Sequence, residues 1–107
     1  MNNETLIQNI NHAMELALPP GLSLHELRLR LQKEINELIA NNFNQLVSIL
    51  YRVDVNERKL KFLLQENVGE DAAVIIADLL IERQLEKIKA RAAFKQDNAQ
   101  PDDEEKW

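Results

Sequence analysis

The sequence predicts an all-α fold, a small bundle of about four helices. Only 2 of the 107 residues are glycine and 3 are proline, while leucine, isoleucine, valine and alanine supply most of the apolar content. This composition favours helices over turns. Apolar residues recur at intervals of three and four along most of the chain, which is the period of a helix with one buried face. We expect one domain, with residues 1–95 as its helical body.

The first helix is expected over residues 3–18, with an asparagine at position 2 or 3 as its N-cap. Its apolar residues fall on one side: Leu6, Ile7, Ile10, Ala13, Met14 and Ala17. Pro19 and Pro20, followed by Gly21, predict the end of this helix. Proline has no N–H to donate, and it disfavours helical geometry in the residue before it.

A second helix is predicted to begin at Ser23, because Ser23 and Glu26 have the spacing of a capping box. The apolar positions that follow keep one helical phase: Leu24, Leu27, Leu31, Ile35, Ile39, Phe43, Leu46, Leu50 and Val53. We therefore predict one long helix over residues 23–52. A kink or short break at Asn41 and Asn42 is the alternative, since asparagine favours caps over helix interiors.

Asp54 and Glu57 match a second capping box, which predicts a short third helix. Its core face is expected to carry leucines, with one phenylalanine as a further candidate: Leu60, Leu63, Leu64 and Phe62. Gly69 is expected to close it, because glycine readily adopts the left-handed conformation that follows many helices.

The fourth helix, predicted over residues 70–94, contains the densest apolar run of the chain. Its first half is apolar on almost all sides, so we expect it to be the central element of the core. After Leu85 only the side that carries Leu85, Ile88 and Ala92 stays apolar, and the helix should emerge into solvent. Residues 96–107 are polar and acidic, and we predict a disordered tail there.

Three carboxylates interrupt the apolar surface of the fourth helix: Asp71, Asp78 and Glu82. We expect a solvent-facing strip, and if one member is buried we expect it to be Asp78. Ion pairs are one alternative and a Mg²⁺ or Ca²⁺ site is the other. The cations available for such pairs cluster around the start of the third helix: Arg52, Arg58, Lys59 and Lys61.

A polar cluster lies where the second and third helices are predicted to meet. We expect a structural corner, in which Tyr51 packs partly and Arg52 pairs with Asp54 or Asp78. The alternative is a small anion or partner site completed by nearby cations. The candidate polar site therefore comprises Tyr51, Arg52, Asp54, Arg58, Lys59, Asp78 and Glu82.

Residue types needed for common catalytic and metal sites are few. The chain has no cysteine, which excludes disulfides and thiolate metal sites. His12 and His25 lack the Glu-x-x-His spacing of di-metal bundles, and neither glycine has the glycine neighbours of a phosphate-binding loop. We predict no catalytic residue, no cofactor and no metal site, and therefore expect that the protein is not an enzyme.

The charge of the chain is unevenly distributed. The net charge is −5, and residues 95–107 hold five acidic residues against two basic ones. The remainder has no broad basic field, so non-specific nucleic-acid binding is disfavoured. No apolar run approaches the roughly 20 residues that span a bilayer. The polar, acidic start MNNETL does not resemble a signal peptide, so we expect a cytoplasmic protein that makes no membrane contact.

For function, the sequence favours a non-enzymatic helical interaction or structural module that self-associates. The predicted helices over residues 23–52 and 70–94 are longer than the usual mean of about 11 to 12 residues. We therefore expect them to extend beyond one small core and to need a partner that covers their apolar sides. We expect a homodimer in which the Leu85, Ile88 and Ala92 side, with part of the second helix, meets a second copy. The alternative is a nucleic-acid-associated adaptor that uses two basic rows. These are Arg52, Arg58, Lys59 and Lys61, and Arg83, Lys87, Arg91 and Lys95.

Overall fold

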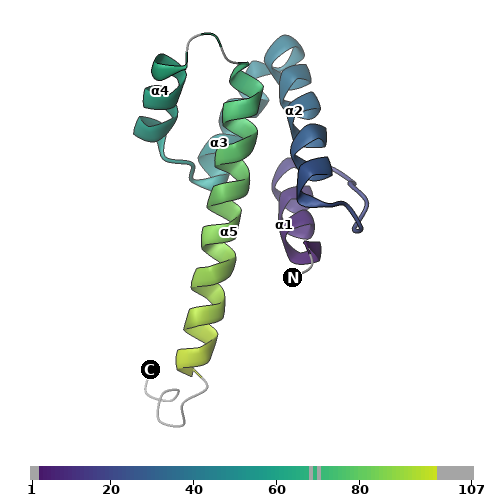
Figure 1. The fold of residues 1–107 in the computed structure, drawn as a ribbon, viewed down its shortest axis with the longest axis vertical. Coiled ribbons are helices and arrows are strands. Elements are labelled where there is room, and N and C mark those ends of the chain that lie inside the picture. The colour runs from purple at the N-terminus through teal and green to yellow at the C-terminus, as the bar shows by residue number, and fades with distance from the viewer. Residues whose placement is uncertain (1–2, 68, 70, 99–107) are drawn as a thin grey trace.

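The computed structural model describes residues 3–67, 69 and 71–98, with side chains placed up to residue 94. All regular secondary structure in this part of the chain is α-helical, which confirms the predicted all-α class. Its helices are α1 (Glu4–Met14), α2 (Leu24–Asn41), α3 (Phe43–Val53), α4 (Glu57–Glu66) and α5 (Ala72–Asn98). In Figure 1, α5 runs down the middle of the molecule, with α1 and α2 on one side and α4 on the other.

The first half of α5 is the centre of the core, as the sequence predicts. It packs against α1, α2, α3 and α4, and Ala73 and Ala77 have no exposed surface. The largest fully buried side chains come from α1, α2, α3 and α5: Ile7, Ile10, Leu27, Leu31, Ile35, Leu46, Ile49 and Leu80. The four helices therefore share one apolar core.

The second half of α5 extends beyond the other helices (Figure 1). Leu85 and Ile88 are half-buried and residues 89–94 are exposed. The radius of gyration is 16.1 Å, whereas a compact domain of this length is expected to have about 13 Å. The helix therefore emerges into solvent after Ile88, which still packs against the core, and so later than the predicted position after Leu85. Helix α5 runs to Asn98, so the predicted start of the tail at residue 96 is too early. Residues 99–107 lie outside the described residues.

Helix α1 is shorter than predicted, because it ends at Met14 and not at residue 18. Glu15 adopts the left-handed conformation with φ of 57° and donates its N–H to the Asn11 carbonyl. The Asn11 side chain then accepts from the Leu18 N–H at 2.9 Å and donates to the Leu18 carbonyl at 3.1 Å. Asn3 occupies the N-cap position without a side-chain capping bond. Asn11 thus fastens the connecting segment against α1 before the prolines are reached.

The single helix predicted over residues 23–52 is wrong, because Asn42 divides it into α2 and α3. The Asn42 side chain accepts a hydrogen bond from the Gln45 N–H, while its own N–H donates to the Leu38 carbonyl. Asparagine offers the backbone an alternative to helical bonds, and here that local effect prevails. After the joint, α3 contacts α2 and buries Leu46, Ile49 and Val53, whereas Phe43 is exposed.

The second predicted capping box, formed by Asp54 and Glu57, is wrong, because Asp54 does not begin the third predicted helix. It ends α3 instead, with φ of 68° and an N–H that donates to the Leu50 and Tyr51 carbonyls. Helix α4 is capped two residues later by Asn56, whose side chain accepts from the Lys59 N–H at 3.0 Å. The predicted box fails because the Asp54 backbone is already used to close the preceding helix.

Helix α4 lacks the buried core face predicted for it. Leu60, Leu63 and Leu64 are only half-buried, and Phe62 is 58% exposed. The reason is position, since α4 lies at the edge of the bundle and packs mainly on α5 (Figure 1). A helix covered on one side only retains several apolar side chains near solvent.

The capping box at the start of α2 is confirmed, and it gives a first testable prediction. The Glu26 N–H donates to the Ser23 hydroxyl at 3.1 Å, and the Ser23 N–H donates to the Glu26 carboxylate at 2.9 Å. The bond from the Ser23 backbone, followed by that from its side chain, lowers the pKa of Glu26 below its ordinary value of 4.5. We expect Ser23→Ala to lower the free energy of unfolding by about 1 kcal/mol at neutral pH in urea titrations.

The pH dependence of this cap follows from the lowered pKa. The stabilisation by the ionised Glu26 is present above pH 4.5 and is lost as pH falls through the lower folded-state pKa. The stability difference between the parent chain and Glu26→Gln should therefore shrink below pH 4.5. A difference that grew on acidification would contradict this role of Glu26.

Candidate functional site

The carboxylate strip on α5 is both solvent-facing and ion-paired. Burial was expected for Asp78 before the other two, but its side chain is 47% exposed, about as much as that of Glu82 at 48%. Arg28 on α2 donates to both of its oxygens, at 2.8 and 3.1 Å. Lys59 on α4 donates to both oxygens of Glu82, at 3.1 and 3.0 Å. Each carboxylate thus links α5 to a different helix.

Asp71, the third carboxylate of the strip, serves the start of α5. One of its oxygens accepts from the Ala73 N–H at 3.0 Å. Among the described residues, no group of three or more carboxylate and histidine side chains converges on a point where a metal ion could bind. The structure therefore offers no support for the metal interpretation of this strip, and the ion-pair interpretation gains two cross-helix contacts.

The polar cluster predicted around Tyr51 does not converge on one site. Tyr51 is 87% exposed, so its expected partial packing is wrong. Arg52 pairs with neither predicted carboxylate, because its Nη1 donates to the Ala13 carbonyl at 2.8 Å. Asp54 instead accepts from Arg83, through its side chain and its carbonyl, both at 3.1 Å. Arg52 thus reaches toward α1 while Asp54 faces α5.

Several cations of the two predicted basic rows already have acidic partners. Lys59 pairs with Glu82, and Lys61 pairs with the carboxylate four residues earlier in α4. Arg83 contacts two carboxylates, and its hydrogen bond to the side chain of Glu86 is the main cause of its raised pKa. Arg58 is exposed on α4. The rows are therefore partly neutralised, and the predicted anion site near Arg52 is not assembled.

A groove lies between the start of α2 and the middle of α5. We call it the α2–α5 groove. Leu24 is 43% exposed on its α2 side. Leu85 is half-buried on its α5 side, and charged side chains surround these apolar ones. The lining residues are Leu24, Arg28, Asp78, Ile81, Glu82, Leu85, Glu86 and Lys89.

The groove continues onto residues 85–94 of α5, which we call the α5 arm; Leu85 and Ile88 still pack against the core, and residues 89–94 extend from it. Leu85 belongs to both, and Ile88 and Ala92 follow it at helical spacing on the same side of α5. Ile88 is half-buried and Ala92 is exposed. The groove and the arm thus form one continuous surface with an apolar centre.

A second exposed apolar surface lies on α3. Phe43, Val47 and Tyr51 are 58%, 45% and 87% exposed and recur every four residues, so they form one row on the helix. Phe43 was predicted to lie in the core phase of a continuous helix, which is wrong because the joint at Asn42 begins a new helix there. The four-residue spacing of these residues is visible in the sequence. It was missed because Phe43 was assigned, together with Leu46, to the buried face of one long helix.

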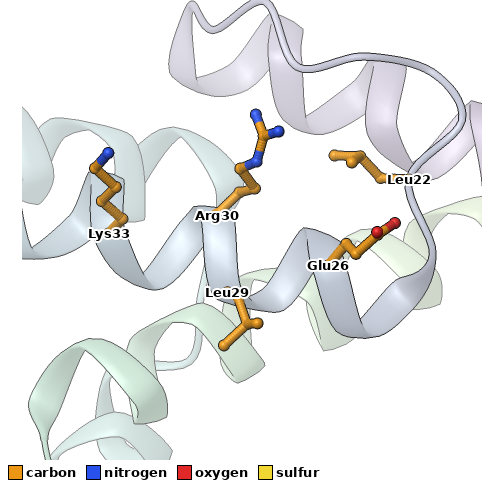
Figure 2. A pocket seen from close by; sticks show the side chains of 5 residues that line it. All are labelled: Leu22, Glu26, Leu29, Arg30 and Lys33. Carbon is orange, nitrogen blue, oxygen red and sulfur yellow. The ribbon is translucent and has the colours of Figure 1, made fainter.

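Figure 2 shows an open recess beside the α1–α2 connection, lined by Leu22, Glu26, Leu29, Arg30 and Lys33. Arg30 and Lys33 point to one side of α2, whereas Leu29 points to the other (Figure 2). The Glu26 carboxylate already accepts the hydrogen bond of the Ser23 N–H. These side chains do not converge, so the recess is a weaker candidate than the α2–α5 groove.

Comparison with protein-family models, curated proteins and solved structures finds no match. Within the described part of the chain, the helices fall short of the length and apolar content that a membrane span requires. We therefore rest the function on the geometry of the exposed surfaces, and above all on the groove and the arm.

Proposed function

We propose that the protein is a non-enzymatic helical interaction module that binds protein partners through the α5 arm and the α2–α5 groove. One observation carries this proposal: the apolar side of α5 continues from half-buried residues at the edge of the bundle to an exposed position on the extended part of the helix. Leu85 and Ile88 are half-buried against the core, and Ala92 continues their helical spacing at an exposed position. Amphipathic helices that leave one apolar side uncovered are a recurring means of helix recognition.

Energetics support a covering partner for this side. Fully burying a large aliphatic side chain contributes roughly 1.5–3 kcal/mol, and Leu85 and Ile88 are only half-buried in the isolated chain. Leu24 adds a third aliphatic side chain at the edge of the groove, 43% exposed. A partner helix that covered these three would gain a compact apolar contact, which is typical of the centre of an interface.

The surrounding charges have the arrangement of an interface rim. Glu86 and Lys89 line the groove and are exposed. A polar, solvated rim around an apolar centre is the usual pattern of protein interfaces, where it contributes to specificity more than to affinity. We therefore expect partner choice to depend on these charges and binding strength to depend on the aliphatic residues.

Most of the charged groups near the groove are held in ion pairs within the chain. Arg28 pairs with Asp78, and Lys59 pairs with Glu82. Nucleic-acid binding, the second candidate from the sequence, is less favoured, because Lys59, Lys61 and Arg83 are paired with carboxylates. Phosphate binding by these side chains would require those pairs to break.

Site-specific photo-crosslinking in the native cells tests the proposal. A benzophenone amino acid at Ala92, on the apolar side of the arm, should yield a covalent adduct with a protein partner. The same probe at Glu37, which is exposed on α2, is the matched control and should yield little adduct. Equal labelling from both positions, or no adduct from Ala92, would overturn the proposed binding surface.

A further inference from the structure

We propose that a basic flank of α5 binds the acidic segment that follows this helix in the same chain, residues 99–107, which lie outside the described residues. The basic flank consists of Lys87 and Arg91, with Lys95 at the next position of the same row. At about 100° per residue, this flank lies on the side of α5 opposite the α2–α5 groove. The inference therefore goes beyond the proposed function and does not depend on it.

Positive charge is concentrated in one stretch of an acidic chain. Residues 87–95 contain four cations and no carboxylate, whereas the whole chain has a net charge of −5. The acidic segment at residues 99–107 contains four carboxylates and one cation. Neighbouring blocks of opposite sign attract each other, and the four carboxylates match the four cations in number. This charge complementarity selects the acidic segment as the occupant of the basic flank.

The cations of the basic flank have no acidic partner among the described side chains. Lys87 is half-buried and Arg91 is exposed, and neither forms an ion pair with any described side chain. The described carboxylates within α5 lie on a different side of the helix and are paired with other cations: Asp78, Glu82 and Glu86. The negative charge opposite the flank must therefore come from elsewhere.

The basic flank continues a side of α5 that is buried within the bundle. Ala73, Leu80 and Gln84 share this side at helical spacing, and all three are buried. The arm extends past the other helices (Figure 1), and residues 89–94 are exposed. Phe94, 62% exposed, adds an aromatic ring to the flank. The side that the other helices cover in the bundle is thus open along the arm.

The helix dipole accounts for only part of this charge pattern. A cation near the C-terminus of a helix is favoured, but the effect falls off within the last turn. Helix α5 ends at Asn98, so Lys95 lies in its last turn. Arg91 and Lys87 lie further back, beyond the reach of this effect. An anionic segment beside them supplies the negative charge that the dipole does not.

The acidic segment is long enough to reach the flank. Since an α-helix rises 1.5 Å per residue, Arg91 and Lys87 lie roughly 10 and 16 Å back from Asn98. An extended chain covers about 3.3 Å per residue, so Asp102 to Glu105 reach roughly 13 to 23 Å from the same point. The two ranges overlap. Charge attraction over this distance does not require one fixed conformation of the segment.

Such a contact makes the acidic segment an internal competitor. A segment joined by a short flexible connection has an effective concentration in the millimolar range at its binding site. An external polyanion must displace it before reaching the basic flank. The segment thereby reduces non-specific binding of polyanions to the arm.

Energy transfer from a single tryptophan measures the contact in the full chain. Trp107 is the only tryptophan, and the chain has no cysteine. An uncharged dansyl acceptor can therefore be attached at Ala90→Cys, an exposed position on the arm. We expect efficient transfer at 0.1 M salt and a loss of about half of it at 1 M salt, because the Debye length falls from about 10 to about 3 Å.

Charge reversal locates the contact on the basic flank. Lys87→Glu combined with Arg91→Glu should lower the transfer at 0.1 M salt to the value that the parent chain has at 1 M. Replacing all four carboxylates of the acidic segment with lysine should do the same. The two reversals together should give higher transfer than either alone, because opposite charges again face each other. A loss of folding in one variant could not produce this recovery.

Arg30→Glu combined with Lys33→Glu is the matched control, since it makes the same charge change at exposed cations on one side of α2 (Figure 2). Transfer should be unchanged. An equal loss in this control, or transfer that responds neither to salt nor to reversal of the flank, would overturn the inference. Transfer from an undyed chain to a dyed chain carrying Trp107→Phe would show a contact between copies and would also overturn it. Photo-crosslinking from Ala92 tests the proposed function separately, so the two failures are distinguishable.

Discussion

Replacing Leu31 with alanine is expected to lower the free energy of unfolding by about 3 kcal/mol, the usual range for a buried leucine being 2–5 kcal/mol. Leu31 has no exposed surface and lies in the middle of α2. It belongs to the core cluster that also includes Leu27, Ile35 and Leu80. Removal of its isobutyl group loses apolar burial and leaves a cavity that neighbouring helices fill only in part.

Urea denaturation followed by circular dichroism at 222 nm measures this loss. Leu29→Ala is the matched control, because the same atoms are removed from the same helix at a position that is 51% exposed. Its effect should stay within about 0.5 kcal/mol, as for most surface substitutions. Similar losses for the two variants would show that α2 does not bury the face described here.

The features that sequence predicts well in this chain depend on near neighbours. The spacing of Leu27, Leu31 and Ile35 identified the buried face of α2, and all three have no exposed surface. Ser23 and Glu26 identified its start, since a capping box involves residues only three apart. The dense apolar run likewise identified the first half of α5 as the centre of the core.

The features that sequence missed depend on distant residues or on competition between two local preferences. Arg28 and Asp78 are separated by 50 positions, and periodicity carries no information about which cation meets which carboxylate. Arg52 likewise reaches a backbone carbonyl 39 positions away. At Asn42 the helical phase favoured continuity while the side chain favoured a cap, and the pattern alone did not decide between them.

The candidate site shows the same division. The apolar side of the arm followed from the spacing of Leu85, Ile88 and Ala92, because a helix that leaves the core keeps its period. The groove beside it required the placement of α2 against α5, which brings Leu24 to Leu85 from 61 positions away. Sequence therefore indicated one half of the proposed surface, and the tertiary fold supplied the other.

Ala77→Leu is expected to destabilise the fold by about 2 kcal/mol, within the 1–3 kcal/mol that overpacking of a core usually costs. Ala77 has no exposed surface and lies in the core cluster of α5. The small side chain lets other core residues approach α5 closely, and a leucine there adds three carbon atoms where packing leaves no room. Since leucine forms helices nearly as well as alanine, helix propensity contributes little to the loss.

Ala90→Leu is the matched control, because the same change is made in the same helix at an exposed position. Thermal and urea unfolding should show a near-neutral effect for it. A stable Ala77→Leu variant would show that α5 can shift within the bundle.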